Sequence, residues 1–215
     1  GEGEKAGRYI LEFDADKGET VQLKIAISTV CREGAAASLI EENPGWDFAS
    51  IRKATRDKWN EIFARAVIKG SHDQKVSFYT SMYHLYIQPS NIADTDGNYR
   101  GADGKVSHSP GGRYYSTLSL WDTYRAAHPL YTILTPEIVD DVVNSMIAHY
   151  EAVGILPIWN LWGKENYTMV GNHAVPVIAD AYLKGFDGFD EEKAFEAVKT
   201  SLTRSHRNSD WETYM

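Results

Sequence analysis

The spacing between apolar residues changes near Cys31, and this change constrains the fold more than any other feature of the chain. Before Cys31, every second residue from Val21 to Ile27 is apolar, which is typical of a β-strand with one buried face. Beyond Cys31, apolar residues recur at the spacing of one face of an α-helix. The sequence therefore predicts an α+β fold in which strands come first and helices follow.

Residues 1–30 are predicted to contain two strands, over 8–13 and 20–27, with turn residues at 16–19 between them. Two strands alone do not make a stable sheet in water. Because residues 1–30 supply only these two strands, we expect them to be the end of a larger β domain.

The rest of the chain is predicted to be mainly helical. Helices are expected over 35–42, 46–68, 73–88, 117–134, 136–153, 170–184 and 190–203. Pro89 ends the third of them, and the fifth begins with Thr135 as its N-cap and Pro136 in its first turn. Residues 90–116 and 155–169 are predicted as loops, and loops of this length in a compact domain usually carry function.

The charge balance argues against nucleic acid and anionic membranes as partners. The 215 residues include 22 lysines and arginines against 30 aspartates and glutamates, a formal net charge of −8. Binding to phosphate groups needs clustered basic side chains, and the sequence has no basic run. No apolar run approaches the roughly 20 residues of a membrane span. A single cysteine also excludes an internal disulfide.

Aromatic side chains make up 12% of the chain, and their faces either fill the core or stack on sugar rings. If 117–134 is a helix, Trp121, Asp122 and Arg125 share one surface, because residues three and four positions apart are neighbours on a helix. The indole can stack on a sugar while the carboxylate accepts hydrogen bonds from its hydroxyls and the guanidinium donates to them. The alternative is a helix salt bridge beside a core tryptophan.

A second group of candidates lies in the predicted loop 155–169 and just beyond it. Trp162, Glu165 and His173 combine an aromatic face, a carboxylate and an imidazole ahead of a helix. Glu165 is a candidate general acid or ligand for a hydroxyl, and His173 is a candidate ligand or helix cap. Either side chain can equally be a hydrogen-bonded structural group.

The sequence contains no recognised metal-binding motif. Residues 94–98 have the composition of a calcium loop, but an EF-hand needs glycine at the sixth position and glutamate at the twelfth. Tyr99 and Lys105 stand at those positions, so a turn rich in aspartate and glycine is the better interpretation. The seven histidines show no HExxH spacing.

Four segments resemble glycoside hydrolase family 92, over roughly residues 70–190. They are DTDGNYRG at 94–101, SLWDTYRAAHP at 119–129, the run from Trp162 to His173, and VPVIADAY at 175–182. The resemblance implies part of an exo-acting, inverting, calcium-dependent α-mannosidase that removes mannose from glycans, with α-1,2 linkages as the expected substrate. It also implies a periplasmic or extracellular location.

The same resemblance implies a β-sandwich domain joined by helices to an (α/α)6 toroid, with the active site between the two domains. On this basis residues 1–30 are the C-terminal strands of the sandwich, 31–70 are linker helices, and 71–215 are the first part of the toroid. Such a toroid needs more helices than are predicted after residue 72. We therefore expect an incomplete catalytic domain whose partner is the rest of its own parent chain.

Inverting glycosidases use a carboxylic acid to protonate the leaving oxygen and a carboxylate to activate water. The resemblance implies that both groups, and most calcium ligands, come from beyond residue 215. No catalytic or metal-binding residue is therefore assigned, and the chain alone is expected to be inactive. The resemblance does imply that Trp121, Asp122 and Arg125 lie at the mannose pocket, and that the three candidates between 162 and 173 belong to the same wall.

The second candidate segment departs from the family pattern. Where the family more often has Asn-Glu-Thr-Asn and Gly-Tyr-His, this chain has Lys-Glu-Asn-Tyr at 164–167 and Asn172 before His173. The linkage preference and the role of Glu165 are therefore not carried over from the resemblance.

Two other functions fit the same residues. A carbohydrate-binding or scaffold module would use the Trp121 surface without hydrolysis, and its full-length protein would have no catalytic carboxylates. Another (α/α)6 glycoside hydrolase, such as a trehalase-like enzyme, would differ in its substrate. An incomplete toroid also exposes apolar helix faces, so we expect this chain in isolation to aggregate, oligomerise or rearrange.

Overall fold

The structure, a computed structural model, describes residues 10–204. Its helices are α1 Arg32–Glu42, α2 Phe48–Phe63, α3 His72–Leu85, α4 Leu120–Thr123, α5 Ala127–Leu134, α6 Val139–Val153, α7 Ala174–Leu183 and α8 Glu191–Thr203, with a 3₁₀ turn η1 over Pro136–Ile138. Its strands are β1 Ser90–Asn91, β2 Asn98–Arg100, β3 Val106–His108, β4 Tyr115–Ser116, β5 Leu118–Ser119, β6 Trp159–Leu161 and β7 Lys164–Glu165. The fold therefore mixes helices with short strands, as the predicted class requires, but the described strands lie within the spans 90–119 and 159–165 and not ahead of the helices.

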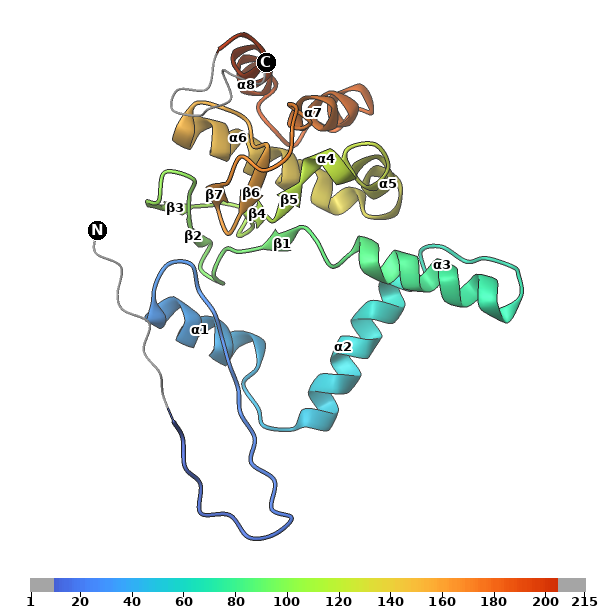
Figure 1. Ribbon diagram of the computed structural model, residues 1–215, viewed down its shortest axis with the longest axis vertical. Coiled ribbons are helices and arrows are strands. Elements are labelled where there is room, and N and C mark those ends of the chain that lie inside the picture. The colour runs from blue at the N-terminus through green and yellow to red at the C-terminus, as the bar shows by residue number, and fades with distance from the viewer. Residues whose placement is uncertain (1–9, 205–215) are drawn as a thin grey trace.

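Helices α4 to α8 and the short strands form one packed body, while α1, α2 and α3 extend away from it (Figure 1). The main core lies in this body, around α6, where Val143 and Met146 have no exposed surface. Leu120 and Leu156 are equally buried and belong to the same cluster. Full burial of side chains of this size stabilises a fold by about 1.5–3 kcal/mol each. No helix within residues 10–204 is long and apolar enough to cross a membrane.

Three small antiparallel sheets lie beside this core. Strands β1 and β4 pair, β2 and β3 pair, and β5, β6 and β7 form a three-stranded sheet in that order. In the last sheet Ser119 is opposite Trp159, and Asn160 is opposite Glu165. This register places the start of α4 beside the start of β6, and it fixes where the candidate site residues lie.

Segment 90–116, predicted as a loop, contains β1 to β4, and two stacked tyrosines pack at its centre. The rings of Tyr99 and Tyr114 lie 3.8 Å apart at 9° and are buried. Arg100 joins this unit to the preceding chain by donating to the carbonyl oxygens of Thr29 at 2.7 Å and Val30 at 2.9 Å.

Four helices, α1, α3, α6 and α8, agree with the predicted spans to within three residues, whereas α2 ends five residues early, at Phe63.

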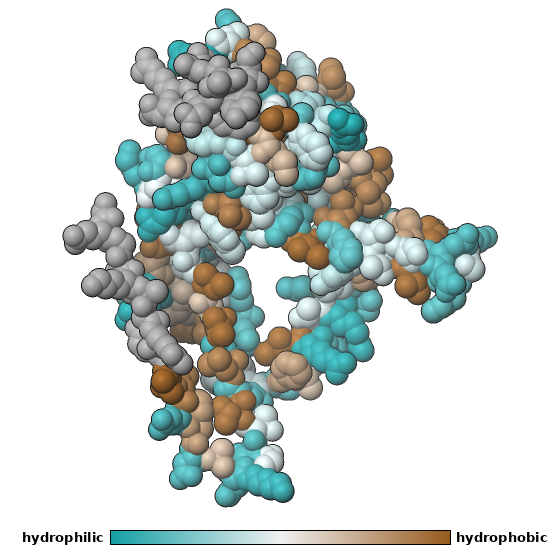
Figure 2. All heavy atoms as spheres, viewed as in Figure 1, coloured by the Kyte–Doolittle hydropathy of each residue, from teal (hydrophilic) through white to brown (hydrophobic). Residues whose placement is uncertain are grey.

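The two strands predicted over 8–13 and 20–27 are not formed: residues 10–30 contain no strand, and residues 8 and 9 lie outside the described chain. Ile25 and Ile27 keep 75% of their surface exposed, and Figure 2 shows apolar atoms along this extended segment. The physical reason is that an alternating sequence becomes a strand only when another strand pairs with it. Among the described residues no segment offers that pairing.

The single helix predicted over 117–134 is also wrong, because β5, α4, a turn and α5 occupy that span. Thr117 has φ of 60°, which is left-handed and cannot begin a helix. Pro129 lies in the first turn of α5, and proline is tolerated in a helix only there. The predicted 170–184 helix begins later, at Ala174, and the predicted 155–169 loop contains the β6–β7 hairpin.

Candidate substrate-binding site

Helix α4 presents the first group of candidates on an open surface. Leu120 anchors it in the core with no exposed surface, and the next residue, Trp121, is 45% exposed. The Asp122 carboxylate accepts a hydrogen bond from the hydroxyl of Ser119, the residue before the helix. Trp121 and Asp122 thus face solvent among residues 10–204, where Trp121 is not part of the core.

Arg125 lies beyond the end of α4, so it is not the helical neighbour of Asp122 that the predicted helix implied. No ion pair between the two is found among residues 10–204. Instead, Nε of Arg125 donates to the hydroxyl of Tyr124 at 2.8 Å. The guanidinium carbon lies 5.3 Å from the centre of the Tyr124 ring, within the range of a cation–π contact.

His173 comes to the same place from a distant part of the chain. Its ring stacks on the ring of Tyr124, with centroids 4.2 Å apart and an interplanar angle of 4°. Partial burial lowers the pKa of His173, and the positive charge of Arg125 lowers it further. The imidazole is therefore neutral at pH 7 and can both donate and accept a hydrogen bond. Although His173 occupies the N-cap position of α7, its side chain makes no capping bond.

Trp162 lies apart from this group, at the tip of the β6–β7 hairpin. Its φ is 50°, its side chain is 51% exposed, and the next residue, Gly163, packs so closely that a Cβ there would lie 2.2 Å from the carbonyl oxygen of Arg100. Ser119, the residue before α4, pairs with Trp159 at the start of β6, whereas Trp162 follows the end of β6 in the turn. The structure thus separates Trp162 from Trp121.

Trp162 lines a polar groove of about 480 Å³ between residues 25–29, α1 and the 91–94 segment. Two of the polar side chains of this groove make internal hydrogen bonds. Asn91 accepts from the backbone N–H groups of Ala93 and Tyr114, and Asp94 accepts from the hydroxyl of Ser28. We interpret the groove as part of the packing interface between these segments.

Glu165 is almost completely buried, with 4% of its side chain exposed. Its carboxylate accepts hydrogen bonds from four backbone N–H groups. They belong to Ile158 at 2.7 Å, Trp159 at 3.0 Å, Asn166 at 3.0 Å and Tyr167 at 2.9 Å. This is the geometry of a structural anion, which was one of the two predicted possibilities. A role as a sugar ligand stays a prediction that this geometry does not favour.

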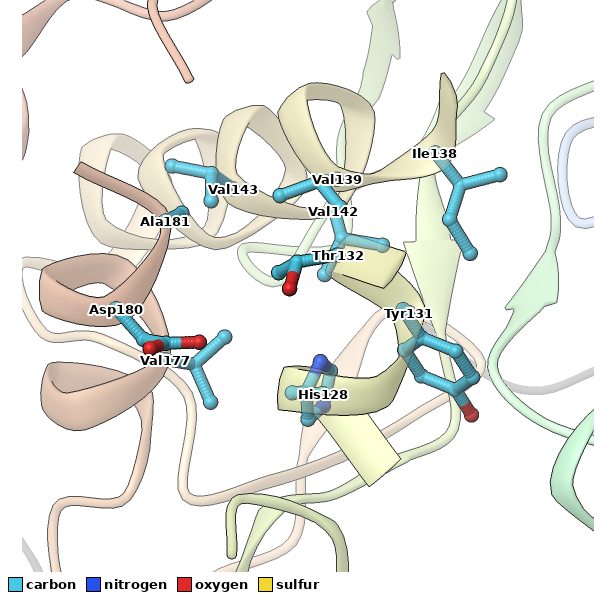
Figure 3. A pocket seen from close by; sticks show the side chains of 10 residues that line it. All are labelled: His128, Tyr131, Thr132, Ile138, Val139, Val142, Val143, Val177, Asp180 and Ala181. Atoms are coloured by element: carbon cyan, nitrogen blue, oxygen red, sulfur yellow. The ribbon is translucent and has the colours of Figure 1, made fainter. Parts of the chain in front are cut away.

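Two further cavities do not involve the candidate residues. A void of about 10 Å³ lies between α5, α6 and α7, lined by His128, Tyr131 and Val143 among others (Figure 3). It is at most the size of one water molecule. An apolar groove of about 480 Å³ lies between α7 and α8, with Tyr182 and Phe195 in its lining. Trp121, Asp122, Arg125 and His173 line none of these cavities.

The described residues do not fit a calcium site. Calcium needs six to eight oxygen ligands, and carboxylates usually supply several of them. Within residues 10–204 no group of three or more histidine, cysteine, aspartate or glutamate side chains is placed to hold a metal. Asp122 is bonded to Ser119, and Glu165 has four backbone donors around it.

The sequence analysis missed two residues of this region. Tyr124 links Arg125 to His173, and its position inside the 119–129 run was the available indication. Asn160 has no exposed surface and accepts from the hydroxyl of Ser116 at 3.4 Å and the backbone N–H of Leu118 at 3.2 Å, which fixes β5 against β6. No pattern in the sequence indicates that role, because both partners are more than 40 residues away.

Known proteins match this chain along most of its length. Residues 34–215 match the glycosyl hydrolase family 92 catalytic domain. The structure is similar to the family GH92 alpha-mannosidase BT3965 from Bacteroides thetaiotaomicron, with 36% identity and a TM-score of 0.81 over 87% of this chain. It is also similar to the family GH92 inverting mannosidase BT2199 from the same organism, with 31% identity and a TM-score of 0.78 over 84% of this chain.

These relatives are much longer than the chain. It covers 25% of each of the two mannosidases, and 22% of an uncharacterized secreted glycosidase from Arthroderma benhamiae, to which it is 24% identical over 201 residues. The family match nevertheless takes in most of the described residues, including both groups of candidates. The chain belongs to glycoside hydrolase family 92.

Proposed function

We propose that the full-length protein is an exo-acting α-mannosidase that hydrolyses mannose from glycans, and that this chain supplies part of the mannose pocket. The match of residues 34–215 to the family's catalytic domain carries the proposal. The similarity to two mannosidases, one of which is also known in complex with mannoimidazole, supports it.

In this proposal the surface around α4 binds the sugar. Trp121 is exposed and offers an indole face for stacking on a pyranose ring. Asp122 offers a carboxylate as an acceptor, and Arg125 offers guanidinium N–H groups as donors, so the two bind neighbouring hydroxyls in fixed orientations. His173, held against Tyr124, adds a neutral imidazole beside them. None of these residues is proposed as the general acid or base.

We further propose inversion at the anomeric carbon, α-1,2 linkages as the substrate, and a requirement for calcium. The similarity to BT2199, an inverting mannosidase, supports the first. The calcium requirement is supported by the family resemblance alone, since the described residues do not fit a calcium site. A location outside the cytoplasm is supported by the description of the fungal relative as secreted.

For the architecture, we propose that residues 1–30 are the C-terminal strands of a β-sandwich, that 31–70 are linker helices, and that 71–215 begin an (α/α)6 toroid. The alternating apolar residues of 20–27 support the first part. They are exposed here, and their pattern fits a strand that pairs within a sheet of the full-length protein. The shared core of α5 to α8 supports the last part.

The proposal is tested by measuring mannose release from α-1,2-mannobiose by the full-length protein, with EDTA and with calcium restored. We expect release that EDTA abolishes and calcium restores. Binding of mannose without release would instead support a carbohydrate-binding module, and release of glucose from trehalose would support the trehalase-like alternative.

The α4 surface is tested separately with Trp121→Ala in the full-length protein. Loss of a stacking contact worth about 0.5–1.5 kcal/mol should weaken substrate binding by roughly two- to twelvefold. The matched control is Trp46→Ala, because Trp46 is also exposed, at 57%, and lies outside the candidate site. An equal effect of both substitutions would remove Trp121 from the proposed pocket.

A further inference from the structure

The carboxylate of Glu165 contacts the backbone on both sides of the β6–β7 hairpin. On one side it accepts from the N–H groups of Ile158 and Trp159, where β6 begins. On the other side it accepts from the N–H groups of Asn166 and Tyr167, just after β7 ends. One buried side chain therefore closes the base of the hairpin.

Three of these bonds go to Oε1 and one, from Ile158, goes to Oε2, so they use most of the acceptor capacity of the group. An ionised carboxylate has about four lone-pair sites in its plane. The imidazole of His149, from α6, lies next to Oε2 of Glu165. Its Nε2 is 3.7 Å from Oε2, and its side chain has no exposed surface. Because only 4% of the side chain is exposed, a sugar hydroxyl has little access to Oε2, and at Oε1 it would have to displace a backbone N–H, which loses a hydrogen bond. Glu165 is thus poorly placed to bind or protonate substrate itself.

The backbone that Glu165 holds is unfavourable without such support. Three residues other than glycine have left-handed φ values in this segment: 50° at Trp162, 55° at Tyr167 and 69° at Met169. Residues of this kind persist only where the surroundings fix them, and they gather at functional sites. The N–H of Tyr167 is itself one of the four donors, so the carboxylate fixes one of the strained residues directly.

The segment leads to both groups of candidate residues. Strand β6 pairs with β5, where Ser119 lies opposite Trp159, and α4 begins directly after it. In the other direction the chain runs from Tyr167 to His173, which stacks on Tyr124. A shift at the base of the hairpin would therefore move Trp162 and His173 and loosen the support of Trp121.

We propose that Glu165 is a positioning residue, whose carboxylate holds segment 155–173 in the shape that places Trp162 and His173, and that it does not act on the substrate. The part of this inference that concerns turnover rests on the proposed mannosidase function. The part that concerns the backbone does not, and the experiment separates the two.

The first measurement uses leaving groups. In the full-length protein, Glu165→Gln should lower kcat/KM by roughly tenfold, since glutamine keeps only one acceptor oxygen and at least one of the four backbone N–H groups loses its acceptor. The loss should be the same for α-1,2-mannobiose and for an aryl α-mannoside with an activated leaving group. A general acid behaves differently, because an activated leaving group needs no protonation and its hydrolysis survives the substitution. Sparing of the aryl mannoside alone would overturn the proposal.

The second measurement is hydrogen exchange, which needs no activity. In Glu165→Gln the amides of 158, 159, 166 and 167 should exchange about tenfold faster, while those of α6 do not change. Glu61→Gln, at an exposed position of α2, is the matched control for loss of charge and should leave all of these amides unchanged.

The outcomes distinguish the two proposals. Absence of mannoside hydrolysis by the unaltered protein would defeat the proposed function, and faster exchange in Glu165→Gln would still support the positioning role. Unchanged exchange at the four amides would overturn the positioning role whether or not the protein is a mannosidase. Glu165→Gln is preferred to Glu165→Ala because it keeps the volume of the buried side chain.

Discussion

The ring of Tyr124 is contacted from two sides. His173 stacks on its face at 4.2 Å, and Arg125 donates to its hydroxyl at 2.8 Å. A flat ring held in this way has little rotational freedom left, so the imidazole and the guanidinium are presented in fixed directions. For a site on an open surface, such preorganisation reduces the entropy lost when a sugar binds.

Gly171 makes this arrangement possible, and Gly171→Ala should disturb it. Its φ is 90°, and a Cβ would lie 2.8 Å from Nε2 of His173. We expect a loss of about 1–2 kcal/mol in the free energy of unfolding from the left-handed backbone, together with weaker substrate binding from displacement of the imidazole. Urea unfolding and KM of the full-length protein measure the two effects.

The control is Gly185→Ala. Gly185 has a similar φ of 84°, but a Cβ there would meet no atom within 4 Å. It should share the loss of stability and leave KM unchanged. A similar rise in KM for both variants would mean that the contact with His173 is unimportant.

The burial of His128 predicts that the free energy of unfolding falls at acid pH. Burial lowers its pKa from 6.5 to about 4, so the folded protein keeps it neutral while the unfolded chain takes up a proton below about 6.5. The contribution is therefore fully present above pH 6.5 and is lost as the pH falls toward 4, on the order of 3 kcal/mol in all. The buried His149 acts in the same direction.

The measurement is urea unfolding of the full-length protein between pH 4 and 7. His128→Phe should flatten the pH dependence, because the ring can still pack against Tyr131 but no longer titrates. His72→Phe, at an exposed position, should leave the dependence as it is. A slope that His128→Phe does not change would refute this assignment.

At the scale of elements, α6 organises the packed body. It contacts η1, β4, α7 and α8, and its apolar stripe recurs every three or four residues. The side chains of this stripe fill the shared core rather than a ligand site, since the void beside them holds at most one water molecule.

Met146→Ala should therefore destabilise the protein by about 2–5 kcal/mol, because Met146 has no exposed surface and its removal leaves a cavity. Val153→Ala on the same helix, where the side chain is 39% exposed, should cost much less. Urea unfolding of the full-length protein compares them, and equal losses would show that α6 is not the centre of the core.

The predicted elements were confirmed where a long helical stripe runs without interruption, as in α6 and α8. They were wrong over 117–134, although Pro129 already restricts a helix to begin within the preceding turn. The strands over 20–27 failed for another reason. Their alternation is real, but a strand is completed by hydrogen bonds to a neighbour, and no described segment provides one.

At the scale of the whole molecule, two apolar surfaces lack a partner within residues 10–204. One is the extended N-terminal segment, with Leu23, Ile25 and Ile27 exposed. The other is the groove between α7 and α8, beside which Leu183 is 81% and Phe195 68% exposed. Contiguous apolar surfaces of this kind promote association.

The 215-residue chain in isolation should therefore self-associate. Size-exclusion chromatography with light scattering should give masses above 24.2 kDa, rising with concentration. Ile27→Thr and Phe195→Glu should reduce the association, because each replaces an apolar side chain on one of the two surfaces with a polar one. A clean monomer that melts cooperatively would contradict this prediction.

The sequence by itself determined that the fold mixes helices and strands, and it determined the family, because these depend on residue type and on spacing along the chain. Only the tertiary structure decided that Tyr124 joins Arg125 to His173, that Trp162 lies apart, and that Glu165 is enclosed by backbone donors. Those roles depend on which N–H groups and ring faces meet after segments tens of residues apart pack together. Residue spacing along the chain does not show which distant segments pack together.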